Sequence, residues 1–380
     1  MSTFDRIAEL KDSDGPQAAI DFLIGTLREE KNFHKLFDAL LLKKKQELGL
    51  SLVRPTSLED VPADIRPDFE KHYIDSAREV GQLFLDNGQL NEAWLYFRTI
   101  QEPQPVADAL DQMPLPDDYE QAQGLINMAL YEGANPIRGL QYLLQSNGTC
   151  NTITALDQAI GQFPTDDRRR AAQIMVQHLY DELRASVKAD VDRRMTLPPS
   201  AKEPTLRELI LGKDWLFQEG NYHIDVSHLN SVVRFARFLD ADCPELALAI
   251  QLAQYGVQLD QQYQYPAEPP FDDYYAAHLQ FFNLLQGRNV EDAVAFFEQK
   301  IAADPDEEDQ QMIAYVLVDL LIRTNRLDQA MDVASKHLRF LDEPSFSFPD
   351  LCHKAGNTTA WADAAKEKGD LVSFTSALVQ

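Results

Sequence analysis

The residues best suited to chemistry lie in one short segment near the middle of the chain. His223, Asp225 and His228 fall within six residues. Imidazole and carboxylate groups are zinc ligands, and they also serve as acids and bases in catalysis. Common zinc motifs place two histidines four residues apart on a helix, whereas these two are five apart. A metal or catalytic site here would therefore need further ligands from another element.

One further pair has suitable chemistry. His178 and Glu182 lie one turn apart on a helix predicted over 166–195, so both side chains could face one ion. His178 also borders an apolar stripe, where a histidine often completes the edge of a core; the stripe consists of Met175, Leu179, Leu183 and Val187. A combined His/His/Glu site requires this helix to pack beside residues 220–228.

The central segment also has a purely structural interpretation. Asp225 or Ser227 can cap a helix predicted over 226–239, with the Asp225 carboxylate accepting a backbone N–H two or three residues on. His228 would then lie in the first turn. The same helix carries two arginines that we expect to pair with nearby carboxylates, Arg234 and Arg237. We interpret the segment mainly as a capped helix start, and a metal site, a catalytic centre and a polar partner-binding spot stay as alternatives.

Aromatic residues crowd a proline-rich loop and the helix after it: Tyr263, Tyr265, Phe271, Tyr274 and Tyr275. Aromatic side chains are enriched at protein interfaces, so this segment is a candidate binding surface. The same residues could instead fold the long loop back against its helices. We favour packing and keep binding as the alternative.

Other motifs of catalysis and metal binding are missing from the sequence. No nucleophile-elbow, phosphate-loop, dinucleotide-binding or HExxH pattern occurs. The acidic run over 304–309 lacks the central glycine of a calcium loop, and we expect it to begin a helix with Asp306 as the cap. The sequence therefore predicts no cofactor.

The charge balance is strongly acidic. The 380 residues carry a formal net charge of −26, which repels phosphate backbones and argues against a nucleic-acid partner. The basic run Lys43 to Lys45 is expected to form a solvated helix face. Three well-separated cysteines, an acidic start and the lack of a long apolar run predict a cytoplasmic protein without a secretory signal or membrane span.

Helical periodicity dominates the chain. Apolar residues recur at spacings of three and four, separated by short turns that contain Gly, Asn, Asp or Pro. The alternation typical of strands is nearly absent. The sequence predicts an all-α chain of roughly 18 to 20 helices joined by short connections.

Residues 74–107 place small and bulky side chains at informative positions. Two helices are predicted, the first with Ala77, Val80, Gly81 and Phe84, then a turn at Gly88, then a second helix with Ala93 and Phe97, followed by Pro105. Small residues at 81 and 93 would let two antiparallel helices cross closely, with the phenylalanines beside them. The pattern resembles the tetratricopeptide repeat, with Ala77 in place of the usual tryptophan.

Looser copies of this pattern occur elsewhere. Residues 274–307 match at Leu284, Ala293, Phe297 and Pro305, with Phe281 at the small-residue position. Residues 311–344 match at Leu317, Leu321, Ala330, Ala334 and, two places late, Pro344. A fragment of the unit is suggested by Gly15, Ala19 and Leu23, and residues 357–378 are expected to form a terminal capping pair. The resemblance implies an α-solenoid of antiparallel helix pairs with partly degenerate repeats.

Proline-rich breaks suggest four regions. We expect an N-terminal helical region over 1–50, repeats over 67–195, a central helical region over 205–260, and C-terminal repeats with capping helices over 271–380. The sequence leaves open whether the repeats form one continuous superhelix.

The resemblance also implies a function. Repeats of this family hold a partner protein or peptide on a concave face without catalysis. Family members that grip acidic peptide tails use basic residues and asparagine on first helices; Arg78 matches one such position, and Gln82 stands where asparagine is usual. With this net charge, we expect a basic or amphipathic partner. The alternative is a helical metal-dependent enzyme, or an enzyme-accessory domain, with a site around His223, Asp225 and His228.

Overall fold

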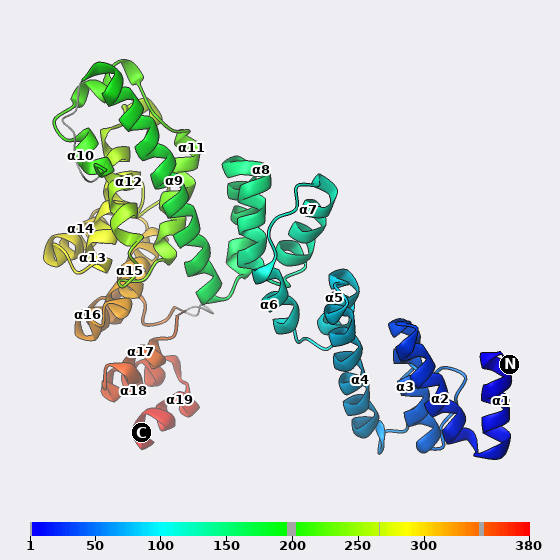
Figure 1. The fold of residues 1–380 in the computed structure, drawn as a ribbon. Coiled ribbons are helices and arrows are strands. Elements are labelled where there is room, and N and C mark those ends of the chain that lie inside the picture. The colour runs from blue at the N-terminus through cyan, green and yellow to red at the C-terminus, as the bar shows by residue number, and fades with distance from the viewer. Residues whose placement is uncertain (1, 196–202, 266, 342–345) are drawn as a thin grey trace. The chain divides into compact units, whose positions relative to one another are not determined.

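The computed structural model describes residues 2–195, 203–265, 267–341 and 346–380, and these residues are helical with no β-strand among them (Figure 1). The predicted all-α class is confirmed. Contacts divide the chain into two units, Met1–Gly148 and Thr149–Gln380. The proline at the end of the third predicted repeat, Pro344, lies outside the described residues.

The first unit is a succession of helices. In chain order they are α1 (Thr3–Ser13), α2 (Pro16–Glu29), α3 (Phe33–Glu47), α4 (Arg66–Asp86), α5 (Leu90–Thr99), α6 (Gln104–Gln112) and α7 (Tyr119–Ile126), the last continuing as a π-helical turn over Asn127–Tyr131. Helix α8 (Pro136–Ala159) follows and carries Gly148, the last residue of the unit, in a non-helical conformation. Neighbouring helices contact one another from α1 through α6.

Helices α4 and α5 cross as the sequence predicts. A Cβ atom added to Gly81 would lie 2.8 Å from the Phe97 ring, so only glycine fits without movement. Ala93 is fully buried at the same crossing. Gly88 forms the turn with a φ of 71°, a left-handed conformation that favours glycine. Small residues therefore set the distance between these two helices.

The second unit is organised around its longest helix, α9 (Thr165–Arg194). Four short elements contact α9: α10 (Leu206–Ile210), the 3₁₀ segment η3 (Asp214–Gly220), α11 (Val226–Phe235) and the 3₁₀ turn η4 (Ala236–Phe238). Helix α12 (Leu246–Gln258) packs on α9, α10 and α11. The prediction of a helix over 226–239 thus needs correction, because the α-helix ends at Phe235 and tightens into a 3₁₀ turn.

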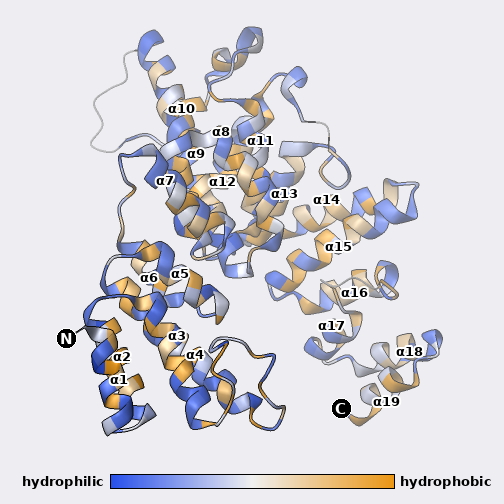
Figure 2. Ribbon diagram, turned by 90° about the vertical axis from the view of Figure 1, so that its right-hand side faces the viewer, coloured by the Kyte–Doolittle hydropathy of each residue, from blue (hydrophilic) through white to orange (hydrophobic). Residues whose placement is uncertain are grey.

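The rest of the second unit returns to pairing between neighbours. It contains α13 (Tyr274–Leu285), α14 (Val290–Ala303), α15 (Glu307–Arg323), α16 (Leu327–His337), α17 (Phe348–Lys354), α18 (Thr358–Lys368) and α19 (Leu371–Val379). Each packs on the next, and α13 also contacts α11 and α15. Figure 2 shows apolar and polar residues alternating around these helices, as one-sided burial requires. The predicted cap of α15 is confirmed, since the Asp306 carboxylate accepts the Glu308 N–H.

One lysine of the basic run Lys43 to Lys45 departs from expectation. Lys45 is fully buried, and its ammonium group donates to Asp60 Oδ1 at 2.6 Å and to the Arg54 carbonyl at 2.7 Å. The Phe69 ring lies 5.7 Å from the same nitrogen. Because a buried ammonium group must be paired, Lys45 fixes the loop between α3 and α4 against the helices. The run is therefore not a uniformly solvated face.

None of the helices, within the residues that the structure describes, combines the length and apolar character needed to cross a membrane.

Candidate functional site

His223 lies against α9, where it contacts Asp190 directly and not His178 or Glu182. Its Nε2 atom is 3.3 Å from an Asp190 carboxylate oxygen, and its Nδ1 atom is 3.0 Å from the Tyr255 hydroxyl of α12. The His223 backbone N–H also donates to that hydroxyl at 2.9 Å. One tyrosine and one aspartate thus hold the imidazole between α9 and α12.

These contacts define the proton arrangement of His223. The Tyr255 oxygen accepts the backbone N–H, which leaves the hydroxyl proton free to donate to Nδ1. The Nε2–H then donates to Asp190. Burial lowers the pKa of His223, although Asp190 opposes this shift, so the neutral imidazole is favoured. A neutral histidine with both nitrogens engaged is a structural bridge between helices.

Asp225 and His228 occupy the start of α11. The Asp225 carboxylate accepts the Ser227 backbone N–H at 2.8 Å and the Ser227 hydroxyl at 2.6 Å, so its predicted role as N-cap is confirmed. The hydrogen bond from the Ser227 hydroxyl is the main cause that lowers the pKa of Asp225, which keeps the carboxylate ionised. His228 lies in the first turn of the helix, as expected for a capped start.

His178 and Glu182 approach each other within α9, with 3.7 Å between His178 Nε2 and a Glu182 carboxylate oxygen. The same imidazole nitrogen lies 2.9 Å from the Thr149 hydroxyl. Glu182, His223 and Asp225 border one open pocket of about 590 Å³ together with Asp190, and neither His178 nor His228 lines it. No group of three His, Cys, Asp or Glu side chains in the described ranges is arranged to hold a metal ion.

Two tyrosines of the predicted aromatic segment are buried anchors. The Tyr274 hydroxyl donates to the Asn230 carbonyl at 2.5 Å, and the Tyr275 hydroxyl donates to the Asn230 side-chain oxygen. Burial raises the pKa of both hydroxyls, so they stay protonated as donors. These contacts pin α13 to α11 and leave both rings inaccessible to a partner.

The remaining aromatic residues divide between interior and surface. Phe271 is buried and stacks on His278 with 4.2 Å between ring centroids. Tyr263 is half-buried against Tyr222, and Tyr265 is 49% exposed while its ring edge meets Tyr274. The predicted binding surface is thus reduced to Tyr265 and part of Tyr263.

Arg78 forms ion pairs with residues of α4 and of the segment after α5. Its guanidinium group forms two bonds to Glu102, at 2.9 and 2.7 Å, and one to Asp75 at 2.8 Å. The hydrogen bonds to Glu102 are the main cause that raises the pKa of Arg78, and Arg78 in turn lowers the pKa of Glu102. A partner carboxylate would have to displace this bidentate pair.

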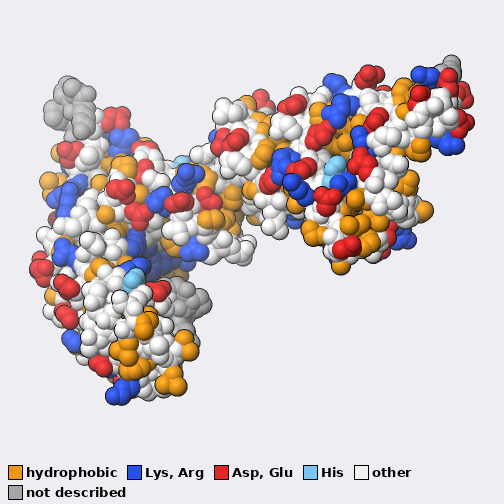
Figure 3. Space-filling model, turned by 90° about the horizontal axis from the view of Figure 1, so that it is seen from below, with side chains coloured by type: hydrophobic (Ala, Val, Ile, Leu, Met, Phe, Trp, Pro, Cys, Tyr) orange, Lys and Arg blue, Asp and Glu red, His pale blue; other side chains and the backbone are white. Residues whose placement is uncertain are grey.

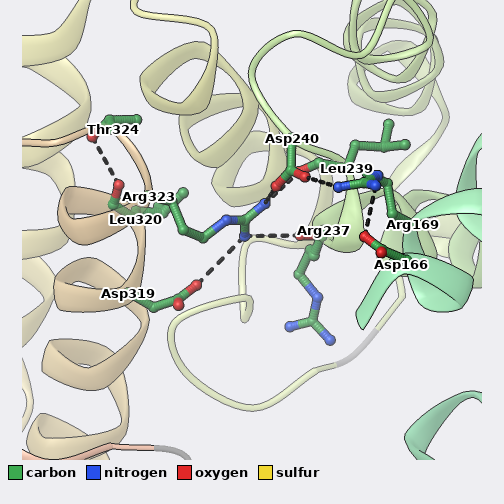
Figure 4. A network of polar contacts seen from close by, with 9 residues as sticks. All are labelled: Asp166, Arg169, Arg237, Leu239, Asp240, Asp319, Leu320, Arg323 and Thr324. Carbon is green, nitrogen blue, oxygen red and sulfur yellow. Dashed lines mark hydrogen bonds and ion pairs between the residues drawn. The ribbon is translucent and has the colours of Figure 1, made fainter. Parts of the chain in front are cut away.

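A charged network that the sequence did not indicate joins three elements of the second unit (Figure 4). Arg169 of α9 contacts Asp166 at 2.7 Å and Asp240 at 2.9 Å. Arg323 of α15 contacts Asp240 at 3.7 Å and Asp319 at 3.4 Å, and it donates to the Arg237 and Leu239 carbonyls. Two of these pairs, Asp166 with Arg169 and Asp319 with Arg323, have ordinary helical spacing. Asp240 lies 71 residues from Arg169, so spacing along the chain gives no signal of the link between the elements.

The two arginines expected to pair with carboxylates behave differently. Arg234 pairs with Asp157 at 2.6 Å, as expected. Arg237 makes no ion pair with any described residue, so that expectation is wrong for this side chain. Its Nε atom donates to the Arg234 carbonyl at 3.3 Å, and its guanidinium group lies over the Phe271 ring, 4.7 Å from the centroid.

Comparison with known proteins gives no relative for this site: no protein-family model matches the chain, and no curated protein matches it.

Proposed function

We propose that this chain is a non-enzymatic interaction scaffold, built as an α-solenoid of partly degenerate tetratricopeptide-like helix pairs, that binds a partner protein or peptide on a concave helical face. The observation that carries the proposal is the crossing of α4 and α5, where Gly81 lies directly under Phe97. Close antiparallel pairs of this kind stack into extended surfaces for partner binding. We further propose that it acts in the cytoplasm.

Contacts between successive helices support the repeat assignment. The pairs α4 with α5, α13 with α14, and α15 with α16 coincide with the three predicted repeats. In the third pair, Ala330 and Ala334 are fully buried, as expected where α16 approaches α15 closely. The terminal pair α18 with α19 presents exposed apolar side chains that a partner or a further helix would cover, namely Leu371, Val372, Leu378 and Val379.

Charge favours a basic or amphipathic partner. The net charge of −26 attracts cationic segments over several ångströms and repels acidic ones. Figure 3 shows carboxylate side chains spread over each unit on the face in view, with basic side chains between them. Arg78, at the position that would grip an acidic tail, is already paired with Glu102.

The proposal is tested with two photo-crosslinking variants. In the related repeats the first helix of each pair faces the partner, so a photo-reactive residue at Gln82 of α4 should capture it. Leu95 of α5 is 59% exposed and belongs to the second helix, so the same residue placed there is the matched control. We expect a recurrent partner linked through position 82 and not through position 95.

Defined peptides add a test of charge. A Lys/Leu amphipathic helix should bind with an affinity that falls as salt rises, and its Glu/Leu counterpart should not bind. Equal capture at positions 82 and 95, together with no preference between the two peptides, would contradict the scaffold. Stoichiometric metal in the purified protein that disappears in His223→Ala would instead support the metal-dependent alternative.

A further inference from the structure

A pocket lies beside the charged network of the second unit, and the proposed scaffold function gives it no role. The pocket has a volume of about 350 Å³ and lies between the start of α9, the turn η4, and helices α13 and α15. Three arginines line it, Arg168, Arg237 and Arg323, together with the Phe238 and Phe281 rings. Small-molecule pockets span about 300–1,000 Å³, so this volume suits a small ligand.

Arg237 is the unusual residue of this pocket. Beyond the single bond from Nε to the Arg234 carbonyl, its guanidinium group makes no hydrogen bond or ion pair with the described residues. Figure 4 shows the group extending away from the dashed contacts of the network. Burial lowers the pKa of Arg237 below its ordinary value. Arg237 is half-buried, so its cation loses part of its hydration without gaining a carboxylate from the described residues, and an anionic ligand would offset that cost.

Arg168 adds a second guanidinium group that pairs with no carboxylate among the residues that the structure describes. It donates to the Phe163 carbonyl at 2.8 Å and to the Gly161 carbonyl at 2.7 Å, which fixes the side chain at the start of α9. Its guanidinium carbon lies 5.9 Å from the Phe238 ring centroid. Neutral carbonyl groups orient this cation and leave its charge uncompensated.

The charge of the surrounding cluster limits the ligand. Four arginines, Arg168, Arg169, Arg237 and Arg323, face three aspartates, Asp166, Asp240 and Asp319, which leaves one positive charge in excess. A singly charged carboxylate balances this excess. A phosphate monoester, with a charge near −2, would add repulsion against Asp319 and Asp240.

We propose that this pocket binds a small carboxylic acid, with its carboxylate on Arg237 and Arg168 and an apolar body against Phe238 and Phe281. Planar guanidinium groups form paired bonds to carboxylates, and the phenyl rings offer apolar contact to the rest of the ligand. The proposal rests on the pocket alone and does not depend on the proposed scaffold function.

Phenylacetate is the probe, because it joins one carboxylate to one ring. We expect saturable 1:1 binding by titration calorimetry and a raised unfolding temperature, with no binding of the uncharged analogue 2-phenylethanol. Arg237→Gln should weaken binding at least tenfold. Arg288→Gln is the matched control, because Arg288 is exposed and makes no ion pair within the described residues, and it should bind like the unaltered protein.

In a second variant we expect phenylacetate to bind more tightly instead of more weakly. Asp319→Asn removes a negative charge that faces the pocket, so it should bind phenylacetate several-fold more tightly, an outcome that structural damage would not produce. No saturable binding of phenylacetate, or unchanged affinity in Arg237→Gln, would overturn the proposal. Tighter binding of inorganic phosphate, or of a peptide ending in phenylalanine, would overturn the assignment to a small carboxylic acid.

Discussion

Two regions of the molecule are built in different ways. The α4–α5 pair is held by apolar contacts between neighbours in sequence, with Gly81, Ala93 and Phe97 at its centre. The cluster around α9 and α13 gathers elements up to 86 residues apart through polar groups, as in the bond from Arg323 to the Arg237 carbonyl. In that cluster Asp190, Asn230 and His278 are all buried.

This difference in construction decides in which region a candidate binding residue is easier to recognise. A pair held by small and aromatic side chains specifies a distance between helices, and it leaves the outer faces free to vary. In a cluster held by polar groups most of the groups are paired, so Arg237, which makes no ion pair with a described residue, and the unpartnered His278 Nε2 atom differ from their surroundings.

The largest loss of stability is expected when a buried core side chain is truncated in either region. Phe97→Ala should cost about 3–5 kcal/mol and Leu179→Ala of α9 about 2–5 kcal/mol, because both side chains are fully buried. If the pair is a local unit, Phe97→Ala should speed amide hydrogen exchange in α4 and α5 and leave α15 and α16 unchanged. Leu179→Ala should speed exchange in α10, α11 and α12 together. If faster hydrogen exchange extended over equally many helices in both variants, the two regions would not differ in how locally they are stabilised.

Next comes the pH dependence of the polar cluster. Burial lowers the pKa of His278 to about 3, with the Arg237 charge as the second cause. The unfolded chain takes up a proton near pH 6.5 and the folded chain does not, so His278 contributes stability above that pH and loses it as pH falls toward 3. At pH 5 the loss is about 2 kcal/mol. Between pH 6.5 and 5, the free energy of unfolding of His278→Gln, measured with denaturant, should decline less steeply than that of the unaltered protein. If both declined equally, the pKa of His278 would not be lowered in the folded chain.

A smaller effect tests the crossing of α4 and α5. Gly81→Ala forces a Cβ atom against Phe97, and we expect a net loss of about 1 kcal/mol after the gain in helix propensity. Gly25→Ala in α2 is the control, because no atom lies within 4 Å of the added Cβ, and it should stabilise by about 0.5–1 kcal/mol. Thermal unfolding of both variants measures the difference, which would vanish if α4 and α5 were not closely packed.

The smallest effect concerns the ion pairs of Arg78. These side chains are largely exposed, so solvent screens their attraction. Arg78→Gln should lower the unfolding temperature by at most about 2 °C, and added salt should remove the difference. A larger drop would mean that these ion pairs contribute more to stability than screened surface pairs normally do.

Local patterns explain which parts of the fold were predictable. Helical periodicity, the small residues at 81 and 93, and the caps Asp225 and Asp306 all act between residues close in sequence. The early end of α11 at Phe235 was not visible, since it depends on how η4 meets α9. Hydrophobic periodicity cannot predict a helix end that is set by contacts with residues distant in sequence.

The candidate sites likewise depend on contacts between residues that are distant in sequence. The sequence left open whether α9 packs beside His223, and it offered His178 and Glu182 as partners where the structure places Asp190 and Tyr255. Tyr255 lies 32 residues from His223, and no spacing rule connects them. Arg237 was visible as a charge, but only its surroundings reveal that no carboxylate reaches it.

The burial of Lys45 has a use as a reporter. Since its ammonium group is enclosed by Asp60, the Arg54 carbonyl and Phe69, an amine-reactive reagent can modify it only after the loop between α3 and α4 opens. Its neighbours Lys43 and Lys44 keep partly exposed side chains and should react at once. Mass spectrometry of the labelled chain would therefore time the opening of this loop, with an internal reference on the same helix.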